Sequence, residues 1–461
     1  MGTQGIGRGR RATALALGCL FAAAAPGTRA QDRENAAPLS VDECVAIALA
    51  NSDALGQAAG GVESARGAHL ADYRVLLPTL GVSATWGRDY QQYRKEIRDL
   101  ERQAALAAGK PLPDKYDGEY SGQMTLQASQ TILSLPGLQS WRASERVLEA
   151  ARNDYRAALS DVELNVRQQF YMYLGTVRIA EVEAQAARIA REQLRRSEVL
   201  FRLGSVARTD VLQAQVNLSE AERTSVLREH DGRIELARLA LVMGLDPNQS
   251  LVVDTTLAAP GPPPEGDVDF WVSQALARRA DLAASRQRLL AAELAVTGAK
   301  QARLPELSAT AAWWRYATDG DDPLLDKSTT NQYNSGWMVS LELSTQLFNG
   351  LLTEGRIEAA KGDRLTRRET VERQEKDIAL EVREAYLDIS AEMNNLEAAR
   401  AGMRLAAENL RLQQALYESG AGTLLEWDNA RLALRRARLA AIQAEISLVL
   451  AHARFSRAVA A

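Results

Sequence analysis

The stretch LPTLGVSATW (residues 77–86) returns later in the chain as LPELSATAAW (residues 304–313), and both copies run from Leu-Pro to tryptophan. Further matches on either side keep a constant spacing within each group. Similarity at a fixed spacing is the signature of internal repeats. We therefore expect two structural repeats, residues 31–245 and 268–461, joined by a proline-rich linker at 246–267 that lies on the surface.

Two tracts without proline, after Gly137 and after Leu324, predict long helices. Both are rich in Ala, Leu, Glu, Arg and Gln, which are good helix formers. In the first tract the apolar residues from Leu148 to Val177 recur every three or four positions, so they share one helix face. A glycine-containing break divides each tract into an outgoing and a returning helix. The predicted helices span about 140–202, 209–244, 351–418 and 424–459.

The N-terminus has the features of an export signal. In residues 1–30, arginines precede the apolar run 12–25, and a small-residue cleavage site ends at Ala30. Cys19 gives a weak match to a lipoprotein box, in which case it would carry lipid. Cleavage after Ala30 would leave Cys44 as the only cysteine, so no internal disulfide is expected.

Composition argues against several classes of protein. The 55 Lys and Arg residues are balanced by 59 Asp and Glu residues, which disfavours nucleic-acid binding. The three histidines and two cysteines lie far apart, and no HExxH, CxxC, P-loop or GxSxG string occurs. We expect no enzyme, no cofactor and no metal site.

Ahead of each long helix the hydrophobic period changes to two. Leu80, Val82, Ala84 and Trp86 alternate with small or polar residues, which predicts a strand. A half-buried strand of a soluble sheet is one interpretation. Export, the long helices between the strands and the tryptophans near strand ends favour membrane strands instead. The strands are predicted at about 79–88, 120–133, 306–315 and 336–347, with Trp86, Trp313 and Trp337 as interfacial aromatics.

Membrane strands would require an oligomer. Four strands are too few to close a barrel, and open sheet edges are not stable in hydrocarbon. Several chains must then share one barrel. The hydrophilic segments 88–120 and 315–333 suit extracellular loops, and the helices would extend into the periplasm.

The chain resembles the TolC-like family of outer-membrane efflux channels. The resemblance rests on LSVDEC (39–44), LP (77–78) and LFNG (347–350), and on the paired strings FRLG…TDVL (201–212) and YESG…TLLE (417–426). It implies a mainly α fold with a membrane β-barrel portion, in a homotrimer with a twelve-stranded barrel and a twelve-helix periplasmic tunnel. It also implies outer-membrane lipid around the barrel and a location in the outer membrane of a Gram-negative-type bacterium.

The same resemblance implies a function and partners. Such channels receive substrate from an inner-membrane pump through a periplasmic adaptor protein, in drug efflux, metal efflux or type I secretion. Which cargo, adaptor or pump applies is not encoded in the residues. The alternative is a trimeric surface or periplasmic coiled-coil scaffold, or an adhesin, without channel activity. That alternative needs continuous heptads, and it leaves the four strands unexplained.

The two helix breaks are the candidate site, because the family's corresponding turns form the periplasmic tip where adaptors dock. Glu426 matches an acidic constriction residue of the family, and three copies would favour cations. The family's latching arginine corresponds to Gly422, for which Arg208 is a candidate substitute. Simple turn chemistry, with Thr209 or Thr423 as helix cap, is the alternative. The candidates are Gly204, Arg208, Thr209, Asp210, Gly420, Gly422, Thr423, Glu426 and Asn429, with Glu342 in the lumen or as a solvated acid at the rim.

Overall fold

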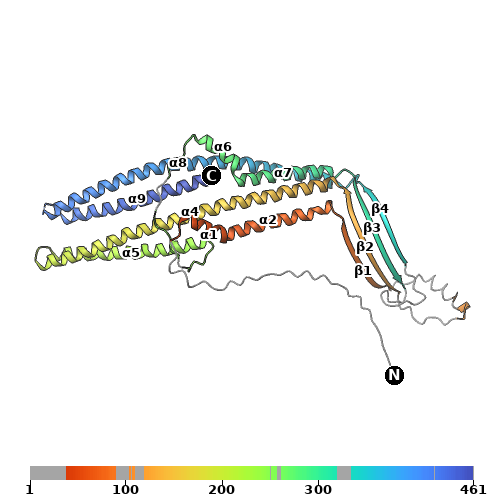
Figure 1. Cartoon of the computed structure of the whole chain (residues 1–461), viewed down its shortest axis with the longest axis horizontal. Helices are drawn as coiled ribbons and strands as arrows, with labels where there is room; N and C mark the ends of the chain where they lie inside the picture. The colour runs from red at the N-terminus through yellow and green to blue at the C-terminus, as the bar shows by residue number, and fades with distance from the viewer. Residues whose placement is uncertain are drawn as a thin grey trace, which may run out of the picture.

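The computed structural model describes residues 38–89, 103–104, 106–109, 119–249, 251–256, 261–318, 334–419 and 421–459. The predicted signal peptide, Cys19, Gly420 and the larger part of the two predicted extracellular loops lie outside these residues. The molecule is elongated, with the strands gathered at one end and the turns of the long helix pairs at the other (Figure 1).

Each repeat has two shorter helices, two strands and a long helical hairpin. The helix α4 has 68 residues and α8 has 67, so each extends about 100 Å at 1.5 Å per residue. The short helices that precede the strands pack along the strand-side halves of these long helices (Figure 1). The first repeat has α1 Val41–Asn51, α2 Asp53–Asp72, the 3-10 turn η1 Tyr73–Val75, α4 Leu135–Arg202 and α5 Arg208–Val242; the second has α6 Val268–Arg278, α7 Ala280–Gln301, α8 Leu352–Glu418 and α9 Leu424–Val459.

The start of α4 lies five residues before the predicted position, for a local chemical reason. Ser134 is the N-cap and its hydroxyl accepts a hydrogen bond from Gly137 N at 3.2 Å. Pro136 lies in the first helical turn, where a missing N–H costs nothing. Pro136 therefore helps to begin the helix.

The strands β1 Thr79–Asp89, β2 Glu119–Leu133, β3 Glu306–Thr318 and β4 Asn334–Ser344 form one antiparallel sheet in the order β1-β2-β3-β4. The two repeats meet where β2 pairs with β3. The predicted extension of the last strand to residue 347 is wrong, because Ser344 already pairs with Glu306, the first residue of β3. No partner backbone continues beyond that pair.

The register divides the sheet into two chemically different faces. One face carries large apolar side chains and is strongly exposed in the single chain, with Leu80 77% and Leu343 70% accessible. The other face is composed mainly of Ser, Thr and Gln, as alternation requires. The apolar face includes Leu80, Val82, Trp86, Met124, Leu126, Leu307, Trp313, Trp337, Val339, Leu341 and Leu343.

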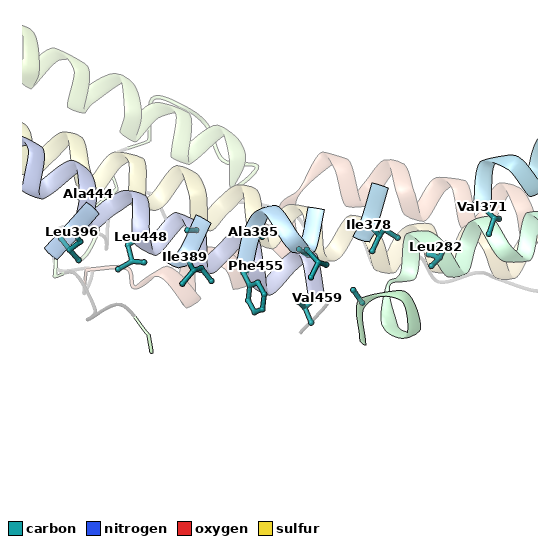
Figure 2. Packing of buried hydrophobic residues seen from close by; sticks show 14 residues of the cluster. Leu282, Val371, Ile378, Ala385, Ile389, Leu396, Ala444, Leu448, Phe455 and Val459 are labelled. Carbon is teal, nitrogen blue, oxygen red and sulfur yellow. The ribbon is translucent and has the colours of Figure 1, made fainter. Parts of the chain in front are cut away.

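Two clusters of buried side chains hold the helices together. In one, Val162, Val166 and Phe170 of α4 pack with α1 and α5, which confirms the predicted apolar stripe. In the other, Ile389 of α8 and Phe455 of α9 pack beside residues of α6 and α7 (Figure 2). Within the described residues, no helix has a stretch apolar enough to cross a membrane.

A buried ionic cluster joins the junction of α6 and α7 to the second hairpin. Arg279, which is only 7% exposed, donates to Asp281 at 2.7 Å and to Glu381 at 2.5 Å. Arg457 of α9 also reaches Glu381, at 2.6 Å, and Asp161 of α4, at 2.8 Å. This cluster therefore connects both repeats around the buried Arg279 guanidinium, while the carboxylates of Glu381 and Asp161 remain partly exposed to water.

Candidate functional site

The first hairpin turn is built by a left-handed glycine. Gly204 has φ of +74°, a conformation in which a side chain would be strained. Ser205 N donates to Leu200 O and Gly204 N donates to Phe201 O, both at 2.9 Å. These two bonds form a Schellman motif, which satisfies the last carbonyls of α4 and reverses the chain.

The returning helix α5 has no side-chain cap. Its N-cap is Ala207, and no side chain accepts a hydrogen bond there. The expectation that Thr209 caps this helix is therefore wrong, because Thr209 already lies inside the first turn. Asp210 also lies in that first turn, where a negative charge suits the helix dipole. Arg208 is exposed and forms no ion pair within the described part of the chain.

The second turn is closed by a tight approach of the backbone to α8. Ala421 N and Gly422 N both donate to Leu416 O, at 2.9 and 3.0 Å. A Cβ on Gly422 would lie 3.0 Å from Leu416 Cβ and 3.1 Å from Tyr417 N. A side chain at position 422 would therefore require these neighbours to give by a few tenths of an ångström.

Glu426 forms a reciprocal capping box with Thr423 at the start of α9. Thr423 N and its hydroxyl donate to Glu426 Oε2 at 2.9 and 2.8 Å, while Glu426 N donates to the Thr423 hydroxyl at 3.2 Å. The hydrogen bonds from the Thr423 backbone and then from its hydroxyl lower the pKa of the exposed Glu426 carboxyl. Thr423 therefore caps the helix as predicted, and Glu426 is held ionised at a fixed position. Asn429, one turn further on, is exposed.

Near this tip, polar contacts join α9 to α4; we call Gln193, Asp428 and Arg431 the seam triad. Gln193 Nε2 donates to Asp428 Oδ1 at 3.3 Å, Arg431 Nη1 donates to Gln193 Oε1, and Arg431 also reaches Asp428 at 3.1 Å. Gln193 is only 8% exposed. A buried amide that serves two charged groups across a helix interface ties the two hairpins together.

Aromatic stacking extends the seam triad to α8. The Trp427 ring stacks on Tyr417 with centroids 5.2 Å apart, and the Arg431 guanidinium lies 5.4 Å from the Trp427 centroid. Trp427 therefore has a packing role at this site. Further from the tip, Arg435 reaches the buried Glu183 of α4 at 3.5 Å.

Sequence reasoning missed the seam triad. Its members come from two helices far apart in the chain, and each resembles an ordinary surface residue of a long helix. The candidate residues that it did name fall into two separate turns. Gly204, Arg208, Thr209 and Asp210 lie at the first, and Gly422, Thr423 and Glu426 lie at the second.

The strand residues are arranged by the register. Trp86, Trp313 and Trp337 all lie on the apolar face, and Trp313 pairs directly with Trp337. Trp313 lies inside β3 and not at its end, because the ladder continues to Thr318 opposite Ser121. Glu342 lies on the polar face opposite Ser308. No group of acidic, His and Cys side chains able to hold a metal ion occurs among the described residues.

Comparisons with known proteins give one consistent assignment. A family model described as "Outer membrane efflux protein" matches residues 45–245 and 271–461. Protein CyaE of Bordetella pertussis is 24% identical over 285 residues, which cover 62% of this chain and 59% of CyaE. The match thus spans about three fifths of that relative's length.

Solved structures share the fold at low identity. The outer membrane channel CmeC of Campylobacter jejuni has a TM-score of 0.74 at 20% identity, over 91% of this chain and 85% of CmeC. The outer membrane protein VceC of Vibrio cholerae has a TM-score of 0.73 at 17% identity, over 91% and 95% of the two chains. The open state of the MtrE channel of Neisseria gonorrhoeae also gives 0.73 at 17% identity, over 91% and 88%.

Proposed function

Since the chain belongs to the outer membrane efflux protein family, we propose that it is a passive exit channel in the outer membrane, assembled as a homotrimer. Channels of this family form trimers within efflux systems. The observation that carries the proposal for this chain is its sheet, which has one apolar face, one polar face and two unpaired edges.

Three copies resolve the problem that this sheet presents. In lipid, the outer edges of β1 and β4 would leave backbone N–H and C=O groups unsatisfied. Pairing β4 of one protomer with β1 of the next closes twelve strands. The apolar face then contacts lipid, and the polar face lines a water-filled lumen. The helical hairpins, three pairs in all, continue the lumen as a tunnel in the periplasm.

The hairpin tips are where we place the entrance and the partners. A periplasmic adaptor would dock there and deliver substrate from an inner-membrane transporter, whether in a tripartite pump or a type I secretion system. The reciprocal cap fixes the ionised Glu426 at the start of α9, so three copies would form an acidic ring that favours cations. Arg208, Asp210 and Asn429 are exposed or half-exposed at the same end, where a partner can reach them.

The seam triad supplies the latch that Gly422 lacks. We infer that the tip opens when the α8–α9 hairpin separates from the α4–α5 hairpin near Gln193. The buried links from Gln193 to Arg431 and Asp428 oppose that movement. The energy for transport comes from the partner pump, because the channel itself has no chemistry to perform.

The test is extraction and conductance. The full chain, solubilised in detergent, is run on a gel with and without heating and is then inserted into a planar bilayer in KCl. We expect a heat-sensitive trimer band and stepwise openings. A monomer that extracts without detergent and gives no openings would refute the channel and favour the periplasmic scaffold.

A further inference from the structure

The polar face of the sheet departs from its own pattern at one place. Its side chains are otherwise small or hydrophilic, but Trp314, Tyr316 and Met338 lie on it. Tyr316 is 39% and Met338 is 48% exposed. We call these three residues the lumen patch. Large apolar side chains exposed on a face meant for water are a signal of binding.

The register joins the lumen patch into one surface. Trp314 and Tyr316 follow each other on the same side of β3, and Met338 pairs with Ala312, next to Trp314 on that side. Trp314 itself pairs with Gly336. A Cβ on Gly336 would lie 2.5 Å from Cζ2 and 2.8 Å from Cε2 of Trp314, so the indole ring lies against the bare backbone of that glycine. The ring is therefore fixed along the sheet, and it leaves Tyr316 and Met338 accessible.

The charged side chains on the polar face of the sheet favour a positively charged ligand. Glu342 and Glu306 lie on the polar face, nearer to the helices than the lumen patch. No Lys or Arg is found among the described side chains of that face. Arg315, between Trp314 and Tyr316 in sequence, belongs to the opposite face by alternation. Aromatic rings attract cations, and the carboxylates further along the same face add a negative potential that disfavours anions in the lumen.

We propose that the lumen patch is a binding band for organic cations that carry aromatic or apolar groups, repeated three times inside the barrel. The inference rests on the proposed trimeric channel, because only closure of the barrel turns this face inward. It names a class of cargo, amphipathic cations, that the lumen would retain and pass on. Loss of the Trp314 ring should weaken such binding by about two- to thirtyfold, the range of one cation–π contact.

The experiment measures block of the open channel by tetraphenylphosphonium. Parent trimers in a planar bilayer are titrated with this cation on both sides, and with tetraphenylborate, an anion of the same shape, as probe control. The variants are Trp314→Leu, which keeps apolar bulk without an aromatic face, and Trp313→Leu, the adjacent residue on the opposite face. We expect two- to thirtyfold weaker cation block in Trp314→Leu, unchanged block in Trp313→Leu, and weaker block by the anion throughout.

Several results would overturn the inference. Equal block of the parent and Trp314→Leu, an equal loss in Trp313→Leu, or anion block as strong as cation block would each remove it. If Trp314→Leu gives no heat-sensitive trimer, Tyr316→Leu carries the test with the same expected weakening. Openings in KCl that tetraphenylphosphonium leaves unchanged defeat this inference alone. Absence of openings in KCl, with no trimer band, defeats the proposed function.

Discussion

Replacing Gln193 by leucine should increase the fraction of time that the channel is open. Leucine has a similar volume, so the substitution removes the amide without leaving a large cavity. It deletes the two contacts that cross from α4 to α9 at the tip, with Arg431 and with Asp428. The contact within α9, between Arg431 and Asp428 at 3.1 Å, is retained.

The expected change in the closed-to-open ratio depends on the hydrogen bonds that are lost and on the ion pair that remains. A hydrogen bond to a charged group contributes about 1.5–3 kcal/mol. Because Arg431 and Asp428 still neutralise each other, neither becomes an isolated buried charge, and the lower end of the range applies. Two such bonds at about 1.5 kcal/mol each, or about 3 kcal/mol together, would shift the closed-to-open ratio by roughly a hundredfold in each protomer.

The assay is single-channel recording at fixed voltage, with Gln185→Leu as the matched control. Gln185 also lies on α4 and accepts from Arg438 at 3.3 Å, but that contact is exposed. Exposed substitutions of this kind change stability by about 0.5 kcal/mol or less, so at most a small change is expected. An unchanged open probability in Gln193→Leu trimers, or an equal rise in the Gln185→Leu control, would refute the latch.

Three further predictions concern charge, pH and a buried thiol. Glu426→Gln should reduce the cation selectivity of the channel and keep the helix cap. Thr423→Ala should keep the charge of Glu426 and lower the stability of the helix by about 1 kcal/mol. Equal cation selectivity in Glu426→Gln and parent channels would contradict the acidic ring. Burial opposes ionisation of Asp281, but hydrogen bonds and charge from Arg279 outweigh it and lower the pKa of Asp281. The stabilisation of the folded state by ionised Asp281 is therefore present above the unfolded pKa of about 3.9 and is lost as the pH falls further. The melting temperature of the trimer should drop below pH 4, and it should drop less in an Arg279→Met variant. Burial, and to a smaller extent the charge of the neighbouring Glu43, raises the pKa of Cys44 to about 11, and the side chain is 0% exposed. A thiol reagent at pH 8 should therefore label Cys44 only after unfolding. Rapid labelling of the native trimer would contradict this packing.

The long-range architecture could be predicted because it depends on local periodicity. A change of period from 2 to 3.6 marks each strand and helix, and constant spacing reveals the duplication. Residues 424–459 form a helix with the predicted bounds, and the faces of the strands follow from alternation. The short helices α1, α2, α6 and α7 were not delimited: α2 and α7 have weak amphipathic patterns, and α1 and α6 have only 11 residues each.

The tip was predictable only where its chemistry is local. The capping box of Thr423 and Glu426 involves residues three apart, so the sequence itself carries the signal. Thr209 gave a similar signal and was wrong, because the chain enters α5 two residues earlier, at Ala207. The contact of Gln193 with Arg431 depends on how two distant helices are aligned along their axes. Periodicity identifies the face of a helix but not its axial position against another helix.

The two turns reverse the chain in different ways, which limits the side chains that position 422 can accept. The first turn uses a left-handed glycine, whereas the second brings its backbone so close to Leu416 and Tyr417 that a Cβ would sit at 3.0–3.1 Å. An arginine at position 422 therefore requires Leu416 and Tyr417 to shift by a few tenths of an ångström, which would disturb the stacking of Tyr417 on Trp427. We expect Gly422→Arg to destabilise the tip by about 1–3 kcal/mol, as overpacking does, and not to restore closure in a Gln193→Leu background. The melting temperature of the trimer and the open probability of the double variant measure both effects. A double variant that closes as often as the parent would show that an arginine in this turn can latch the tip without the seam triad.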